Sequence, residues 1–228
     1  MDRSISRRFQ GSFVGVHIDQ VHLMPSGHQA LEWLLRARLD SRRSVMLPAF
    51  NCNVVQDAVS AAGFRSQFYD FSPAPGVFDW QRVIDEMHPD VGVLVVTHYF
   101  GVPVDFRLVL DHCYSKGIAV IEDCAHTLGG SIGNQQVGTL GDAAIFSFNY
   151  DKPISLGWGG VAVINNAKGF DDALFKDYEL PSVHEEMALF RQFVSAMTER
   201  RRMIPYTHLF VMRALRRTRV FFTVTPIS

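Results

Sequence analysis

The sequence has little that would assign a function by itself. Its 22 lysines and arginines nearly balance 23 aspartates and glutamates, and the net charge of −1 argues against nucleic acid or an anionic membrane as a partner. Only three cysteines are present, Cys52, Cys113 and Cys124, and they form no CxxC pair. They predict reduced core thiols in a cytoplasmic protein. No apolar run is long enough to span a bilayer.

Several cofactor and targeting signatures are also missing. There is no GxGxxG or Walker A motif, which lowers the odds that a bound phosphate belongs to a nucleotide. The nine histidines show no HxxxH or Cys/His spacing, so no metal site is predicted. The polar amino terminus has no apolar segment of the kind found in secretory signals.

What the sequence does have is an alternation of short apolar strands and amphipathic helices. Strands are expected over 20–24, 44–48, 67–70, 91–97, 118–123, 143–148 and 161–164, and helices over 29–38, 54–62, 80–87 and 106–115. This alternation is typical of right-handed βαβ units. It predicts an α/β fold of three αβα layers around a mostly parallel central sheet, in a domain covering residues 1–166.

The composition changes after Asn166, and residues 167–228 are expected to form a separate helical extension, incomplete or truncated. Helical patterns cover 185–202 and 206–219, with arginines at 200–202, 213, 216, 217 and 219. This basic stretch would suit a membrane surface or a partner, but a solvated amphipathic face is the more common use of such a pattern. The apolar end at 221–228 suggests a continuation or a partner that covers it.

Lys152 is the most informative residue. It lies between two apolar strands, in a run that ends in a glycine-rich turn. Burying an amine is costly unless the amine has a partner or a chemical role, and a Schiff base to an aldehyde cofactor is such a role. A surface lysine in a hairpin loop is the equally weighted alternative for this run alone.

Asp123 is the last residue of the expected strand at 118–123. In α/β sheets, ligands bind at the carboxyl ends of the strands, so this position suits a site residue. A buried carboxylate there needs a cation, and a protonated pyridine nitrogen would serve. Taken alone, a helix N-cap is the slightly favoured interpretation.

A phosphate site is suggested at residues 25–30, where small residues open a helix. Ser26 would be a plain N-cap in isolation, whereas Ser147 would complete a phosphate cradle if its strand reached this helix start. Either His98 or His126 could flank a planar cofactor, although a lone histidine is more often structural.

Together these segments resemble the DegT/DnrJ/StrS-type pyridoxal-phosphate sugar aminotransferases, which have the fold-type-I architecture. Six segments carry the resemblance in order: SGHQAL at 26–31, LPAF at 47–50, THYFGVPVD at 97–105, IEDCAH at 121–126, VGTLGD at 137–142 and SFNYDK at 147–152.

The resemblance implies a cofactor, pyridoxal 5'-phosphate, and a role for each site residue. Lys152 would form the Schiff base and later move a proton, and Asp123 would pair with the pyridine nitrogen. His126 would contact the hydroxyl side of the cofactor. Ser147 and the turn of Ser26, Gly27 and His28 would hold the phosphate.

It also implies a function and partners. A lysine at 152, rather than histidine, favours transamination from an amino-acid donor such as glutamate to a nucleotide-linked keto-sugar, in polysaccharide or glycosylated-metabolite synthesis. Family enzymes are homodimers, and they add a C-terminal domain that closes over the substrate. The alternatives are a non-catalytic or regulatory cofactor-binding homologue and a membrane-docked structural protein.

Three departures from the family pattern accompany the resemblance. His28 stands where the family has threonine, which removes a hydroxyl from the phosphate turn. Cys52 stands where an aromatic residue commonly stacks on the pyridine ring, and Trp158 replaces a small or acidic residue near the mouth of the site.

Overall fold

The structure is a computed structural model that describes residues 20–72, 77–149 and 152–171, together with positions 182, 184, 188 and 191. The chain divides into two compact units, Met1–Leu180 and Pro181–Ser228, and every element described below lies in the first. The predicted C-terminal helices, with their arginines and the apolar end, lie outside the described residues except for positions 188 and 191, which are helical.

The first unit is built on a seven-stranded sheet with the order β1-β9-β8-β5-β4-β2-β3. The strands are β1 (Val21–Met24), β2 (Ser44–Pro48), β3 (Arg65–Tyr69), β4 (Val91–Thr97), β5 (Ala119–Asp123), β8 (Ala143–Ser147) and β9 (Gly160–Ile164). The neighbours from β3 to β8 are all parallel, while β9 is antiparallel to both β8 and β1. A small hairpin of β6 (Ser131–Ile132) and β7 (Gln135–Gln136) stands apart from this sheet.

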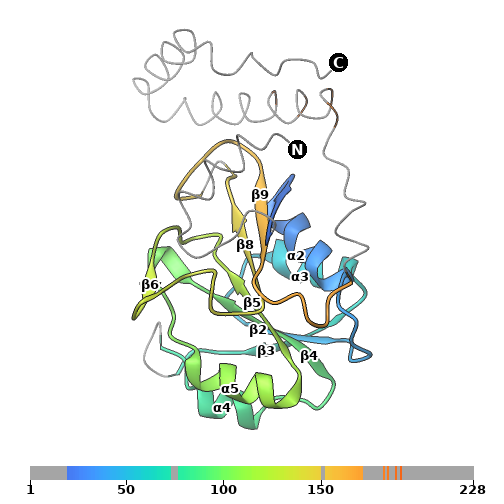
Figure 1. Cartoon of the computed structure of the whole chain (residues 1–228), viewed down its shortest axis with the longest axis vertical. Helices are drawn as coiled ribbons and strands as arrows, with labels where there is room; N and C mark the ends of the chain where they lie inside the picture. Colours follow the sequence, from blue (N-terminus) through green and yellow to red (C-terminus); the bar gives the residue numbers. More distant parts are fainter. Residues whose placement is uncertain are drawn as a thin grey trace. The chain divides into compact units, whose positions relative to one another are not determined.

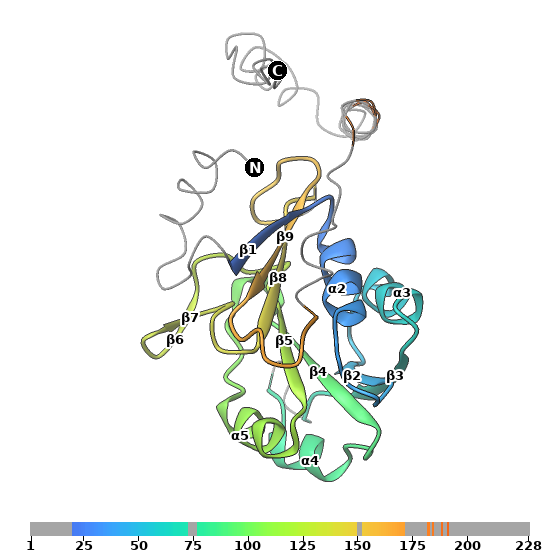
Figure 2. The same cartoon turned by 45° about the vertical axis from the view of Figure 1, so that its right-hand side comes forward.

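Helices cover both faces of the sheet, as Figures 1 and 2 show. Side chains of α2 (Gly27–Arg36) and α3 (Asn53–Ala61) share one buried cluster with Val93 and Val95 of β4. The next residues along that strand, Leu94 and Val96, pack with α4 (Trp80–Asp85) and α5 (Arg107–Lys116). The strand is therefore buried on both faces, and the predicted three-layer α/β architecture with a mostly parallel sheet is confirmed.

The core extends beyond the strand β9. Phe170 is buried in the cluster that contains α2, and it pairs with Arg38 in an isolated β-bridge. The domain boundary at residue 166 stays a prediction. Within the described residues, none of the helices combines the length and the apolarity needed to cross a membrane.

The parallel strands determine where a site can form. The strands β2, β4, β5 and β8 run in the same direction, so their carboxyl ends meet at one edge of the sheet. Thr97, Asp123 and Ser147 are the last residues of β4, β5 and β8. In open α/β sheets this is the edge at which ligands bind.

The start of α2 is brought to the same edge by the turn before it. Ser26 caps the helix, because its Oγ accepts a hydrogen bond of 3.1 Å from the Gln29 backbone amide. Ser26 also forms a β-bridge with Gly159, and the Gly159 amide donates to the Pro25 carbonyl at 2.9 Å. The helix start is thereby attached to the segment that precedes β9.

Candidate active site

An open pocket lies at the carboxyl edge of the sheet. It contains about 490 Å³ of space not occupied by atoms, part of it open to solvent. Six of the seven residues proposed for the site line it together: Gly27, His28, Asp123, His126, Ser147 and Lys152. The seventh, Ser26, is not among the lining residues, and its hydroxyl serves as the N-cap of α2. The roles of these residues stay predictions, but the structure brings the six to one place.

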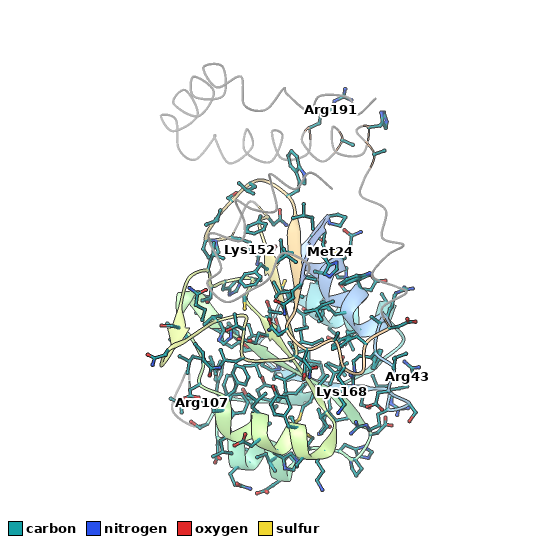
Figure 3. The ribbon with its side chains drawn as sticks, viewed as in Figure 1. Met24, Arg43, Arg107, Lys152, Lys168 and Arg191 are labelled. Atoms are coloured by element: carbon teal, nitrogen blue, oxygen red, sulfur yellow. The ribbon has the colours of Figure 1, made fainter. Side chains whose placement is uncertain are left out.

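Lys152 reaches the pocket from the connection between β8 and β9, and Figure 3 marks its position. The residue is half-buried, and its backbone amide donates to the Asn149 carbonyl at 3.1 Å. The same connection folds back on the end of β8, because the Leu156 amide donates to the Phe148 carbonyl at 2.9 Å. Because β8 and β9 pair antiparallel, Lys152 does lie in a hairpin connection, but the residue is half-buried and lines the pocket, so it is not a plain surface lysine.

Asp123 is almost fully buried at the end of β5. Burial raises the pKa of its carboxyl, while the Ala125 amide, which donates to Oδ1 at 2.9 Å, and the charges of His126 and Lys152 act to lower it. A turn and not a helix follows, so the alternative of a helix N-cap is wrong. A carboxyl held in this way is ionised most easily when a further cation enters the pocket.

The end of the pocket that would favour an anion is formed where α2 meets β8. A Cβ at Gly27 would lie 2.9 Å from the Ser147 Cβ, so the helix start and the end of the strand are in close contact. The first turn of α2 has no acidic residue, and the dipole of the helix favours an anion there. The Nε2 atom of His28, on the same turn, is buried and has no hydrogen-bond partner among the described residues.

The two candidate histidines have different environments. His126 lines the pocket, whereas His98 is completely buried and is not among the residues that line the cavity. The His98 Nδ1 accepts from the Val104 amide at 3.0 Å, so the neutral ring donates from Nε2 to Glu122, 3.0 Å away. His98 is therefore a structural residue.

Glu122 forms the centre of a buried hydrogen-bond network next to Asp123. Its Oε1 accepts from the Leu140 and Gly141 amides at 2.7 and 2.8 Å, and its Oε2 accepts from the Gly138 amide at 2.8 Å. Glu122 lies within 4.8 Å of both His98 and Cys124, a grouping that could hold a metal ion. Because both carboxylate oxygens already accept two donors each, this network is better explained as a support for the loop at 138–141.

Two polar residues of the pocket, Asn51 and Thr97, were not identified from the sequence. The Asn51 Nδ2 lies 3.5 Å from the Thr97 Oγ1, which in turn lies 3.5 Å from the Asp123 Oδ2. Both residues line the cavity. Thr97 is the last residue of β4, next to β5. Its position at the carboxyl end of a predicted strand could have identified it as a site residue.

The expectation for the cysteines is correct for two of three. Cys113 and Cys124 are buried, but Cys52 is exposed and lines the pocket, so it is not a core thiol. Cys52 is the residue before α3, at the carboxyl edge of the sheet. A short apolar segment at this edge does not have to be buried. Trp158 is not among the residues that line the cavity.

Comparison with known proteins identifies the family. The sequence model of the DegT/DnrJ/EryC1/StrS aminotransferase family matches residues 8–198. The chain belongs to this family. Aminotransferases of the family depend on pyridoxal 5'-phosphate.

Individual relatives are aminotransferases and synthases of sugars. The chain is 31% identical over 163 residues to a dTDP-4-dehydro-2,3,6-trideoxy-D-glucose 4-aminotransferase of Saccharopolyspora spinosa, a match covering 68% of this chain and 42% of the relative. It is 37% identical over 122 residues to a GDP-perosamine synthase of Vibrio cholerae, covering 54% of this chain and 33% of the relative.

The fold agrees with solved structures. The aminotransferase TlmJ of Streptoalloteichus hindustanus superposes with a TM-score of 0.66 at 26% identity, over 76% of this chain and 46% of that one. The chain therefore spans less than half the length of these relatives.

Proposed function

We propose that this chain forms the cofactor-binding part of a pyridoxal-phosphate aminotransferase that acts on a nucleotide-linked keto-sugar. The observation that carries the proposal is the meeting of Lys152 and the buried carboxyl of Asp123 in one pocket at the carboxyl edge of the sheet. Membership of the DegT/DnrJ/EryC1/StrS aminotransferase family supports it.

The pocket residues fit the two ends of the cofactor. Asp123 is a buried acid whose pKa is raised by desolvation, and a protonated pyridine nitrogen is the cation that would stabilise its ionised form. At the other end, the start of α2 at Gly27 and the Ser147 hydroxyl offer donors to a phosphate, without an acidic residue in the first helical turn. His126 would contact the hydroxyl side of the ring.

Lys152 would do the chemical work of the chain. When bound, the cofactor supplies an electron sink that stabilises negative charge on a substrate carbon. The Nζ of Lys152 would hold the cofactor covalently and, as a free amine, would carry the proton that leaves the substrate carbon. Asp123 would keep the pyridine nitrogen protonated, which the electron sink requires.

The printed names of the relatives support a nucleotide-linked sugar as the acceptor. The Saccharopolyspora relative is named for a dTDP-linked sugar and the Vibrio relative for a GDP-linked one. Glutamate is the amino donor in the proposal, and the product would enter polysaccharide or glycosylated-metabolite synthesis. A non-catalytic protein that binds the cofactor without turnover is the alternative, and the experiments below separate the two.

The proposal includes a homodimer in the cytoplasm. Phe50 and Val54 are 57% and 44% exposed, and both belong to the segment that enters α3 beside the pocket. Large apolar side chains exposed together are typical of an interface. The three cysteines are free, as expected in a reducing compartment.

Titration with pyridoxal phosphate tests the binding part of the proposal. Wild-type protein should develop a visible absorption band, and borohydride should fix the cofactor to a peptide containing Lys152. Lys152→Ala should abolish the covalent attachment, whereas Lys168→Ala should not, because Lys168 is exposed and lies well away from Lys152 in Figure 3. Absence of attachment in the wild type would refute the cofactor assignment.

A half-reaction tests catalysis. Protein loaded with pyridoxal phosphate and mixed with glutamate should release one 2-oxoglutarate per site and convert the cofactor to its amine form, and a nucleotide-linked keto-sugar should then restore the original spectrum. Attachment through Lys152 without 2-oxoglutarate would support the non-catalytic alternative.

A further inference from the structure

Phe100, which contacts the pocket residue His126, has an unusual backbone conformation. Its φ and ψ are 53° and 31°, and it is the one residue other than glycine with a positive φ in the described part of the chain. Its side chain is 75% exposed. A bulky residue in the left-handed region carries backbone strain. Because the residue is exposed, burial of the phenyl ring does not compensate for this strain. The folding of the turn therefore does not explain why position 100 is a phenylalanine.

The ring of Phe100 is stacked on the imidazole of His126. The two ring centroids are 5.6 Å apart and the planes differ by 22°. The neighbouring rings of Phe50 and Tyr99 meet Phe100 at 52° and 41°, with centroids 6.5 and 6.1 Å away. The near-parallel contact is thus with the histidine that lines the pocket.

Hydrogen bonds hold the backbone on both sides of this ring. Phe100 lies in the short helix η2 (Tyr99–Gly101), which follows directly after β4 and the buried His98. The Val102 amide donates to the Tyr99 carbonyl at 2.8 Å and closes the turn. The Thr127 hydroxyl donates to the His98 carbonyl at 3.1 Å, so the segments that carry the two stacked rings are also joined by a hydrogen bond.

Of the two stacked residues, His126 lines the pocket and Phe100 is outside the lining, and the pocket has no aromatic side chain at position 52. Cys52 lines the cavity where the family resemblance leads one to expect a stacking residue. We propose that Phe100 is a positioning residue that fixes the plane of the His126 ring at the pocket wall, and with it the ring nitrogens that would contact the hydroxyl side of the cofactor. This inference rests on the proposed pyridoxal-phosphate site.

Two substitutions separate the role of the ring from that of an apolar surface group. Phe100→Leu keeps an apolar side chain and the same backbone strain but removes the ring, whereas Phe100→Tyr keeps the ring. Phe68→Leu is the matched control, because Phe68 is also exposed, at 46%, but lies on β3, the edge strand at the opposite end of the sheet from β9 and β1.

The first measurement needs no cofactor. In an NMR spectrum of the free protein, the ring protons of His126, assigned with His126→Asn, should lie upfield because of the phenyl ring current. The upfield shift should disappear in Phe100→Leu and remain in Phe100→Tyr and Phe68→Leu. An unchanged His126 signal in Phe100→Leu would overturn the stack in solution.

The second measurement uses pyridoxal phosphate as the probe. Phe100→Leu should weaken its affinity about threefold to tenfold, as expected for the loss of one aromatic contact. It should also alter the circular dichroism of the bound cofactor, and Phe100→Tyr should restore both values. Wild-type affinity and dichroism in Phe100→Leu would overturn the positioning role, whereas a wild type that binds no pyridoxal phosphate would refute the proposed function instead.

Discussion

Gly27 and Ser147 are in such close contact that no side chain fits between them. A Cβ placed on Gly27 would lie 2.9 Å from the Cβ of Ser147 and 3.4 Å from its Oγ, closer than side-chain atoms normally approach. The same junction is tight on its other side, where a Cβ on Gly160 would lie 2.4 Å from the backbone carbon of Ser26. The start of α2 is therefore held against β8 and β9 by backbone contacts, and the proposed phosphate site depends on this contact.

Gly27→Ala should destabilise the protein, although alanine usually stabilises a helix relative to glycine. The added methyl group would force α2 away from β8, at a cost of about 1–3 kcal/mol in the free energy of unfolding. The affinity for pyridoxal phosphate should fall as well, because the donors of the turn and the strand separate. Urea denaturation and cofactor titration measure the two effects.

Two controls test that explanation. Ser60→Ala, at an exposed position of α3, should leave both measurements nearly unchanged. Gly27→Ala combined with Ser147→Gly should recover part of the lost stability, since the obstructing Cβ is gone. If Gly27→Ala proved as stable as the wild type, the close contact described above would be incorrect.

Asp123→Asn should stabilise the cofactor-free protein at neutral pH while weakening cofactor binding at least tenfold. Burial raises the pKa of Asp123 in the folded state, so the folded protein binds this proton more tightly than the unfolded chain. The stability contributed by Asp123 is then fully present below its unfolded pKa of about 3.9 and is lost as the pH rises through the raised folded value. Asparagine does not titrate and keeps an acceptor for the Ala125 amide.

The measurement is the difference in unfolding free energy between variant and wild type across pH. This difference should increase from acid to neutral pH in favour of Asp123→Asn and then level off. Asp57→Asn, at an exposed position of α3, should show no such trend. A difference that stays flat with pH would mean that Asp123 is ionised without cost in the free protein.

Glu122→Gln should be among the most damaging single substitutions in the described part of the chain. The carboxylate accepts hydrogen bonds from His98 and from the three backbone amides of Gly138, Leu140 and Gly141. An amide group would direct its own N–H atoms at these donors, at a cost of about 3 kcal/mol. Glu86→Gln should leave the stability nearly unchanged, because Glu86 pairs with Arg82 in an exposed ion pair. Equal stabilities of the two variants would contradict the importance of the buried network.

The sequence predicted the local elements well because their signals are local. The strands at 44–48 and 91–97 have the predicted limits, since each is a continuous apolar run. The helix α5 ends one residue after its predicted limit, at Lys116, and Gly117 follows with a φ of 64°. The residues gathered in the pocket were found through short motifs, and the parallel sheet then brings them to one edge.

What the sequence could not predict depends on contacts between distant segments. The burial of His98 follows from its pairing with Glu122, 24 residues away, and the backbone of Phe100 follows from the turn at the end of β4. The exposure of Cys52 likewise reflects its position at the open edge of the sheet. Periodicity and propensity carry no information about such long-range neighbours, so a lone residue in an apolar run is assigned to the core by default.

The three cysteines provide a last prediction, which reports on the pocket directly. Cys52 is exposed at the cavity, whereas burial raises the pKa of the Cys113 thiol to about 12 and that of Cys124 well above its ordinary value. Because the thiolate is the reactive form, a thiol reagent at pH 8 should label Cys52 in the native protein and the other two cysteines only after unfolding. Pyridoxal phosphate should slow this labelling by occupying the pocket, and Cys52→Ser should abolish it. Labelling of Cys52 at the same rate with saturating cofactor would place the bound cofactor away from α3, and rapid labelling of Cys113 in the native protein would contradict the packing of α5 on the sheet.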